Sequence, residues 1–230
     1  MKRYLPLALA AALSACTTTD FQGGFTPVSE RLGAASDRVV SWTRSLTGTG
    51  PQTRRLDTPL PMLARPAKGQ FRSFVLRDLR SGVEGPMTFR AKGRRLRVEE
   101  PDGCTWRSSL DWFSPSTSWE GCGTSRNWHT GSAQVRVLDP LYPLEIGARG
   151  VYERVATSHT GRTYTRQTIC RVTGAEQVVR GNGALSPAYV VACDDGKRVR
   201  TTWYAPDDGP VAYIQRHAVE GIEDAWVRVQ

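Results

Sequence analysis

Apolar and polar residues alternate with a period of two through the stretch TFRAKGRRLRV at residues 88–98. This period is typical of a β-strand with one buried face, and a glycine in the middle, Gly93, is typical of a tight turn. The stretch therefore predicts a hairpin with one apolar and one basic face. Phe89, Ala91, Leu96 and Val98 are expected on the apolar face, and Arg90, Lys92, Arg95 and Arg97 on the basic face.

Short runs rich in β-branched and aromatic residues continue toward the C-terminus, at residues 133–139, 163–172, 175–180, 188–193, 198–205, 210–217 and 225–230. Turn-forming sequences such as GNG and DDG separate several of them. Closely spaced strands of this kind indicate antiparallel pairing. We expect a mainly β domain over residues 69–230, built as an antiparallel curved sheet that forms a half-barrel, a barrel or a sandwich.

A different period appears at residues 29–46. Apolar side chains recur there every three or four positions, at Leu32, Ala35, Val39, Trp42 and Leu46. This spacing predicts one N-terminal amphipathic helix, because it places all five on one helical face. We expect the helix to dock on the β domain; binding a partner is the alternative. Residues 47–68 contain four prolines and are expected to be a linker.

The chain begins MKRYLPLALAAALSAC. Two basic residues precede an apolar run that is too short to span a bilayer, as in a secretory signal. The residues Leu13-Ser14-Ala15-Cys16 resemble the lipobox of bacterial lipoproteins. The resemblance implies that residues 1–15 are a signal peptide and that Cys16 carries diacylglycerol and an acyl chain such as palmitate. An ordinary secretory signal with an incidental cysteine is the alternative.

The lipobox resemblance also implies a location. In that family an aspartate directly after the cysteine favours the inner membrane, and this chain has Thr17 there. We therefore expect attachment to the outer membrane, facing the periplasm, with residues 16–28 as a tether. Several acyl chains on one residue give lasting attachment, whereas a single chain gives only a marginal one.

Four cysteines remain after Cys16. An even number in an oxidising compartment indicates two disulfides, for which three pairings exist. We favour the two pairs that are local in sequence, Cys104–Cys122 and Cys170–Cys193. The chain has no Cys-x-x-Cys motif, and its three histidines are far apart, so neither a metal site nor a cofactor is expected.

Positive charge is concentrated in one block. Residues 65–97 hold ten basic and two acidic side chains, whereas residues 98–230 hold fourteen basic and sixteen acidic ones. Arginine suits phosphate and carboxylate groups. Arg90, Lys92, Arg95 and Arg97 are therefore candidates for binding an anionic partner: lipopolysaccharide, anionic lipid or an acidic glycan, or another envelope protein, but no nucleic acid. A face that is merely solvated is the alternative.

Three of the seven tryptophans lie between Cys104 and Cys122. We expect Trp106 in the core and Trp112 as a cap of a loop against the sheet, because large aromatic side chains are more often buried than exposed. Trp119 and Trp128 have polar neighbours and are expected to be exposed, which makes them candidates for binding a glycan.

The C-terminal half also resembles a group of uncharacterised β-rich bacterial envelope proteins. Their motif Trp-Tyr-x-Pro-x-x-Gly-x-Val is matched by Trp203, Tyr204, Pro206, Gly209 and Val211. The resemblance implies a curved antiparallel sheet and no known activity. The turn RGNGALSP at residues 180–187 is longer than in that group.

No motif with a catalytic mechanism is present. The chain has no Gly-x-Ser-x-Gly elbow, no His-Glu-x-x-His and no P-loop, and its Asp-Asp pairs precede glycines, as in turns. We therefore expect a non-enzymatic protein with a binding or scaffolding role. The alternatives are a lipid carrier with an acyl-chain cavity in the curved sheet, and a glycan-binding module that uses the tryptophan-rich loop.

Overall fold

A computed structural model describes residues 50–65, 71–123 and 125–230. Every regular element in these ranges is a strand. The strands are β1 (Thr53–Arg55), β2 (Phe74–Asp78), β3 (Glu84–Lys92), β4 (Arg95–Glu99), β5 (Thr105–Ser109), β6 (Ser118–Glu120), β7 (Gly131–Asp139), β8 (Arg149–Ser158), β9 (Thr163–Val179), β10 (Leu185–Asp194), β11 (Arg198–Ala205), β12 (Gly209–His217) and β13 (Gly221–Arg228).

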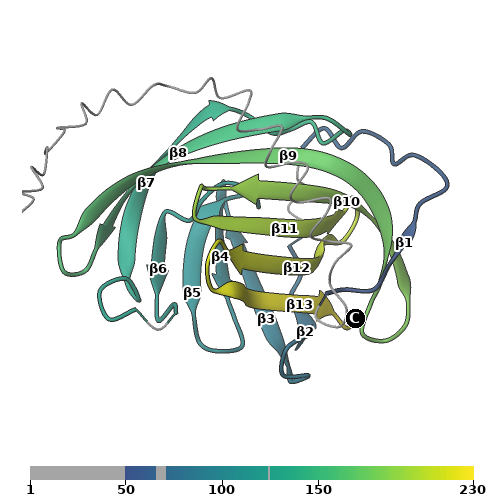
Figure 1. The fold of residues 1–230 in the computed structure, drawn as a ribbon, viewed down its shortest axis with the longest axis horizontal. Coiled ribbons are helices and arrows are strands. Elements are labelled where there is room, and N and C mark those ends of the chain that lie inside the picture. Colours follow the sequence, from purple (N-terminus) through teal and green to yellow (C-terminus); the bar gives the residue numbers. More distant parts are fainter. Residues whose placement is uncertain (1–49, 66–70, 124) are drawn as a thin grey trace, which may run out of the picture.

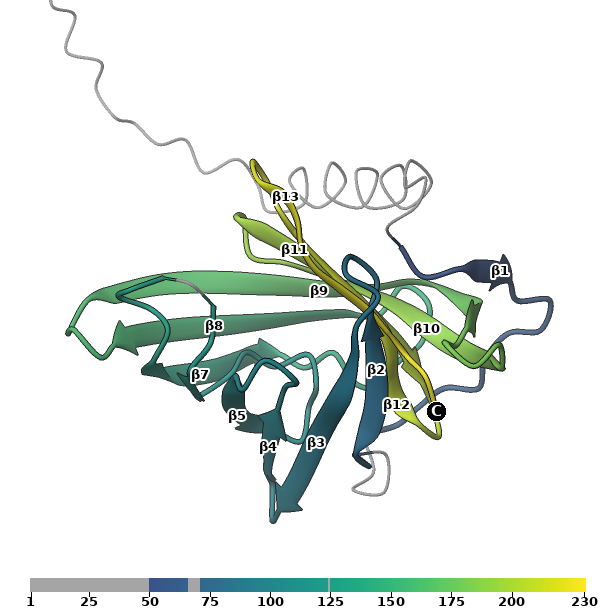
Figure 2. The same cartoon turned by 90° about the horizontal axis from the view of Figure 1, so that it is seen from below.

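The strands β2 to β13 form a closed antiparallel ring in which each strand pairs with the next one in sequence. The ring closes between its first and last members, where Leu76 of β2 lies opposite Arg228 of β13. Strand β1 is added at the edge of β9, beyond the part that pairs with β8. In Figure 1, the long strands β8 and β9 arch over β10 to β13, and Figure 2 shows β2 and β3 diverging from that group. The expected antiparallel curved sheet is therefore a barrel.

Side chains from distant strands and from one loop occupy part of the inside of the ring. The loop 110–117, between β5 and β6, runs into the ring. Its Trp112 contacts Phe89 at 6.0 Å between ring centroids and donates a hydrogen bond to Thr202 Oγ1 at 3.4 Å. Phe113 of the same loop packs on Tyr204 at 5.3 Å. The stapled segment thus places its aromatic side chains between opposite walls of the barrel.

Strands β10 to β13 are buried on both faces. On the face opposite the barrel interior, Val190, Trp203, Ala212 and Val227 lie in one cross-strand row, and each is at most 7% exposed. This explains why the sequence here reads as nearly continuous apolar runs, such as AYVVAC, instead of strict alternation. The helix predicted at residues 29–46 lies outside the described residues.

The two predicted disulfides are present. Cys104 is joined to Cys122, and Cys170 to Cys193. Cys170 and Cys193 lie directly opposite each other in the β9–β10 ladder, and both are buried. Each bond therefore links strands or segments that are already neighbours in the fold.

Several strand expectations need correction. Residues 163–179 form one strand, because a bulge opposite Val190 and Val191 lets the chain continue past Gly174. Strand β8 was not expected at all. Part of the segment expected as a linker takes part in the fold, as β1 and as a bridge between Leu63 and Leu144.

Candidate functional site: a basic face and an arginine–aromatic cluster

The predicted hairpin is strands β3 and β4, and its two faces differ as expected. Phe89, Leu96 and Val98 are buried, with Leu96 and Val98 fully so; Ala91, at the tip, is exposed. Arg90, Lys92, Arg95 and Arg97 are all exposed.

Arginines face each other across three strands of this sheet. Arg90 of β3 lies opposite Arg97 of β4, and Arg97 lies opposite Arg107 of β5. Beside this row, Lys92 lies opposite Arg95. We call these five residues the basic face. Arg107 was not among the predicted site residues, although its alternation with Trp106 and Ser108 in the stapled segment could have placed it there.

Among the residues that the structure describes, no side chain of the basic face forms an ion pair or a hydrogen bond; Thr117 Oγ1 donates to the main-chain carbonyl of Arg107 at 3.2 Å. Some arginines elsewhere in the domain have carboxylate partners: Arg77 contacts Glu84 at 2.6 Å and Arg136 contacts Glu153 at 2.8 Å. Like charges directly opposite each other in a sheet destabilise it, and opposite charges stabilise it. The arrangement of the basic face is therefore unfavourable for the isolated domain and suited to an anionic surface.

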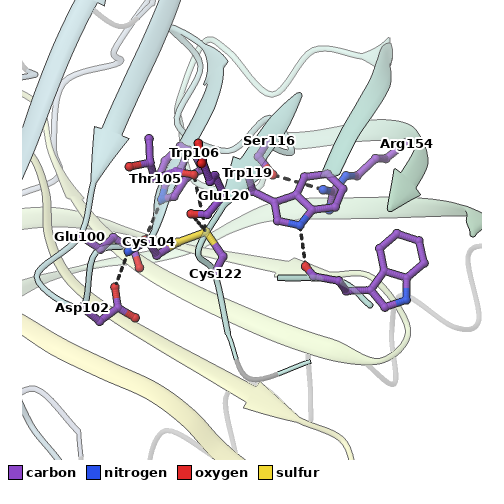
Figure 3. The surroundings of a disulfide bond; sticks show 11 residues. Glu100, Asp102, Cys104, Thr105, Trp106, Ser116, Trp119, Glu120, Cys122 and Arg154 are labelled. Carbon is purple, nitrogen blue, oxygen red and sulfur yellow. Dashed lines mark hydrogen bonds between the residues drawn. A yellow bond between two sulfur atoms is a disulfide. The ribbon is translucent and has the colours of Figure 1, made fainter. Parts of the chain in front are cut away.

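A second cluster of polar and aromatic groups lies around Trp119, on the inner side of β6 (Figure 3). The expected exposure of Trp119 is wrong: it is 9% exposed, and its Nε1 donates to the carbonyl of Trp128 at 2.7 Å. Gly131 of β7 makes this possible, because a Cβ there would come within 2.4 Å of the indole ring. Trp128 is half-buried and stacks on Trp119.

Arg154 of β8 completes this cluster. Its guanidinium lies 4.4 Å above the ring of Trp119 and donates to Ser116 Oγ at 3.3 Å (Figure 3). It also donates to the hydroxyl of Tyr164 at 3.3 Å. Tyr164 also contacts Trp128 at 4.8 Å. Sequence reasoning did not identify Arg154, because it lies on the strand that was not predicted.

The disulfide Cys104–Cys122 lies beside the carboxyl group of Glu100, which is a half-buried residue (Figure 3). Glu100 Oε1 accepts a hydrogen bond from Trp106 Nε1 at 2.7 Å. Burial raises the pKa of Glu100 to about 7; the bond from Trp106 opposes this, and the nearby Asp224 adds to it. Trp106 was predicted to lie in the core; it is half-buried and packs against the core cluster.

Two groups of side chains have the spacing of metal ligands, but their chemistry does not suit a metal ion. In the first, Glu100 and Asp102 lie near Cys104, whose sulfur is in a disulfide. In the second, Glu223 lies near His217, but both of its oxygens accept hydrogen bonds from Arg198.

The described residues contain no helix that is long and apolar enough to cross a membrane. Comparison with known proteins does not assign the chain to a family: no family model matches it, and neither does any curated protein or solved structure.

Proposed function

We propose that this chain is a lipid-anchored envelope protein that binds anionic groups through the basic face, without catalysis, at the periplasmic face of the outer membrane. The partners that fit are the phosphate groups of anionic lipids or lipopolysaccharide. One observation carries the proposal: the row Arg90–Arg97–Arg107, in which like charges face each other across three strands.

Arginine is well suited to this role. Its planar fork donates two parallel hydrogen bonds to a phosphate, and neighbouring forks on a flat sheet can contact several head groups. An acylated Cys16 would keep the domain close to a membrane surface, where each Lys or Arg contributes about 1 kcal/mol of attraction to anionic lipid. The anchor and the basic face therefore act on the same surface.

Replacing Arg90, Lys92, Arg95 and Arg97 together by glutamine should weaken binding to anionic vesicles at least about tenfold, since each contact contributes about 1 kcal/mol. The mature chain with Cys16→Ala is used, so that acyl chains do not dominate. Co-sedimentation with phosphatidylcholine vesicles, with and without phosphatidylglycerol, measures the difference. The melting temperature should barely change, because exposed charges contribute little to stability.

The matched control removes four exposed arginines outside the basic face, Arg54, Arg55, Arg65 and Arg126. It has the same net charge as the first variant and should retain most of the binding. Equal losses in the two variants would mean that only net charge matters, and the basic face would then have no specific role.

The anchor itself is tested in cells. We expect Cys16→Ala to abolish membrane attachment, because the lipobox cysteine is the acylated residue. Membrane fractionation and the intact mass of the mature protein measure this. An unmodified wild-type mass, together with a variant that still fractionates with the outer membrane, would contradict the anchor.

The two alternative functions gain less support from the fold. A lipid carrier needs an apolar cavity, and the loop 110–117 places Trp112 and Phe113 inside the barrel. A glycan platform needs exposed aromatic faces, and Trp119 is covered by Arg154 and Trp128.

A further inference from the structure

Three arginines lie on the inner wall of the barrel, apart from the basic face. Arg154 of β8 lies directly opposite Arg166 of β9. Arg200 of β11 is in one cross-strand row with Cys193 and Cys170. Both cysteines belong to the core inside the barrel, so the side chain of Arg200 also faces the interior. After burial, the charge of Arg200 is the largest influence that lowers the pKa of Arg154, and Arg166 acts in the same direction. The three guanidinium groups thus form one electrostatic cluster.

The cluster has too few acceptors. Asp195 contacts Arg166 at 3.4 Å and is the carboxylate that pairs with it. The buried Nε atoms of Arg154 and Arg200 have no hydrogen-bond partner among the described residues. Leaving buried donors of charged groups unsatisfied is costly, and so is an uncompensated charge. Arg154 and Arg200 form no ion pair with any described residue, so positive charge exceeds negative charge around Arg154 and Arg166. On the far side of Arg200, its cross-strand row continues with Gln215 and Asp224.

The aromatic residues hold the cluster in place and leave it accessible. Trp119 supports the guanidinium of Arg154 from one side, and Tyr164 lies between Arg154 and Arg166, 5.1 Å from the latter. The side chain of Arg166 is 30% exposed, so a ligand can reach the cluster from solvent.

We propose that Arg154, Arg166 and Arg200 form a binding site for a phosphate monoester. Such a group has a charge of roughly −1.5 to −2 at neutral pH and several strong acceptor oxygens, which matches both the excess charge and the free donors. Tyr164 and Trp128, both half-buried, lie beside the cluster, where a sugar ring attached to the phosphate would contact them. The phosphate can belong to a soluble sugar phosphate or to a lipid head group.

Calorimetric titration of the mature Cys16→Ala chain tests the site. Glucose 1-phosphate should bind saturably, and methyl glucoside, which lacks the phosphate, should not. Arg154→Gln and Arg166→Gln should each weaken binding about tenfold or more, because a charge-assisted hydrogen bond contributes about 1.5–3 kcal/mol. If Arg154→Gln does not fold, Arg166→Gln and Arg154→Lys, which keeps the charge but loses the planar fork, provide the test.

Two controls separate this site from the basic face. Arg136→Gln removes an exposed arginine of the neighbouring strand β7 and should bind like the wild type. The basic-face variant should also retain its affinity for glucose 1-phosphate, whatever its behaviour on phosphatidylglycerol vesicles. Vesicles containing phosphatidic acid, a lipid phosphate monoester, distinguish the two sources of the phosphate. If these vesicles compete with glucose 1-phosphate for the site, the ligand is a lipid head group. If they do not compete, the ligand is a soluble sugar phosphate.

The proposal fails if glucose 1-phosphate and phosphatidic acid both show no saturable binding. It also fails if Arg154→Gln and Arg166→Gln bind as tightly as Arg136→Gln.

Discussion

Replacing Cys170 and Cys193 together by alanine should lower the free energy of unfolding by at least about 3 kcal/mol. The bond joins residues 23 positions apart, and its loss frees that loop in the unfolded chain. Both sulfurs are buried in the cluster that contains Tyr152, Tyr189 and Tyr204, so the smaller alanines also leave poorer packing. Urea denaturation under non-reducing conditions, followed by tryptophan fluorescence, measures the loss.

The variant lacking Cys104 and Cys122 is the natural comparison. It opens a loop of 18 positions, so the chain-entropy contribution is nearly the same. Cys122 is only half-buried, and we expect a smaller packing loss there. A cost below about 1 kcal/mol for the Cys170–Cys193 pair would show that the ladder alone fixes β9 against β10.

Replacing Glu100 by glutamine should stabilise the protein by about 2–3 kcal/mol at pH 8 and leave it unchanged at pH 4. The pKa of Glu100 is raised from 4.5 to about 7 in the folded protein. Between these two values the folded state binds the proton that the unfolded state releases, so stability falls as pH rises through this window. Glutamine has no proton to lose, and its oxygen can still accept the bond from Trp106.

The difference between the variant and the wild type is the readout, because other carboxyl groups also titrate. Burial raises the pKa of Asp224 to about 6, so Asp224, like Glu100, lowers the stability as the pH rises. Hydrogen bonds from Arg198 lower the pKa of Glu223, so Glu223 has the opposite effect on the stability. Glu99→Gln, on the exposed face of β4, serves as a control. The interpretation is wrong if Glu100→Gln gives the same gain at pH 4 as at pH 8.

Local features of this fold could be read from the sequence. The alternation around Gly93 defined the β3–β4 hairpin and its basic face, since one buried and one solvated face leave a period of two. The two sequence-local disulfides were also identified. Both depend on residues that are close in sequence.

Features that depend on distant residues could not be read in this way. Strand β8 has the sequence RGVYERVATS, in which Arg154 points inward, so that apolar and polar positions do not separate by face. The burial of Trp119 depends on Gly131, twelve positions away, which has no side chain to exclude the indole. The inner arginine cluster needs β8, β9 and β11 to be placed together, which the successive pairing of β8, β9, β10 and β11 does.

The order of strands in the ring bears on how the chain assembles. Each strand from β2 to β13 pairs with its successor, so the ring can grow one hairpin at a time as the chain emerges with its N-terminus first. Only the join of β13 to β2 brings together strands from opposite ends of the domain, and it spans just three residue pairs. Until β13 has been synthesised and has paired with β2, one edge of β2 has no partner strand and can pair with strands of other chains. The final eight-residue strand, β13, therefore protects the first strand of the ring from aggregation.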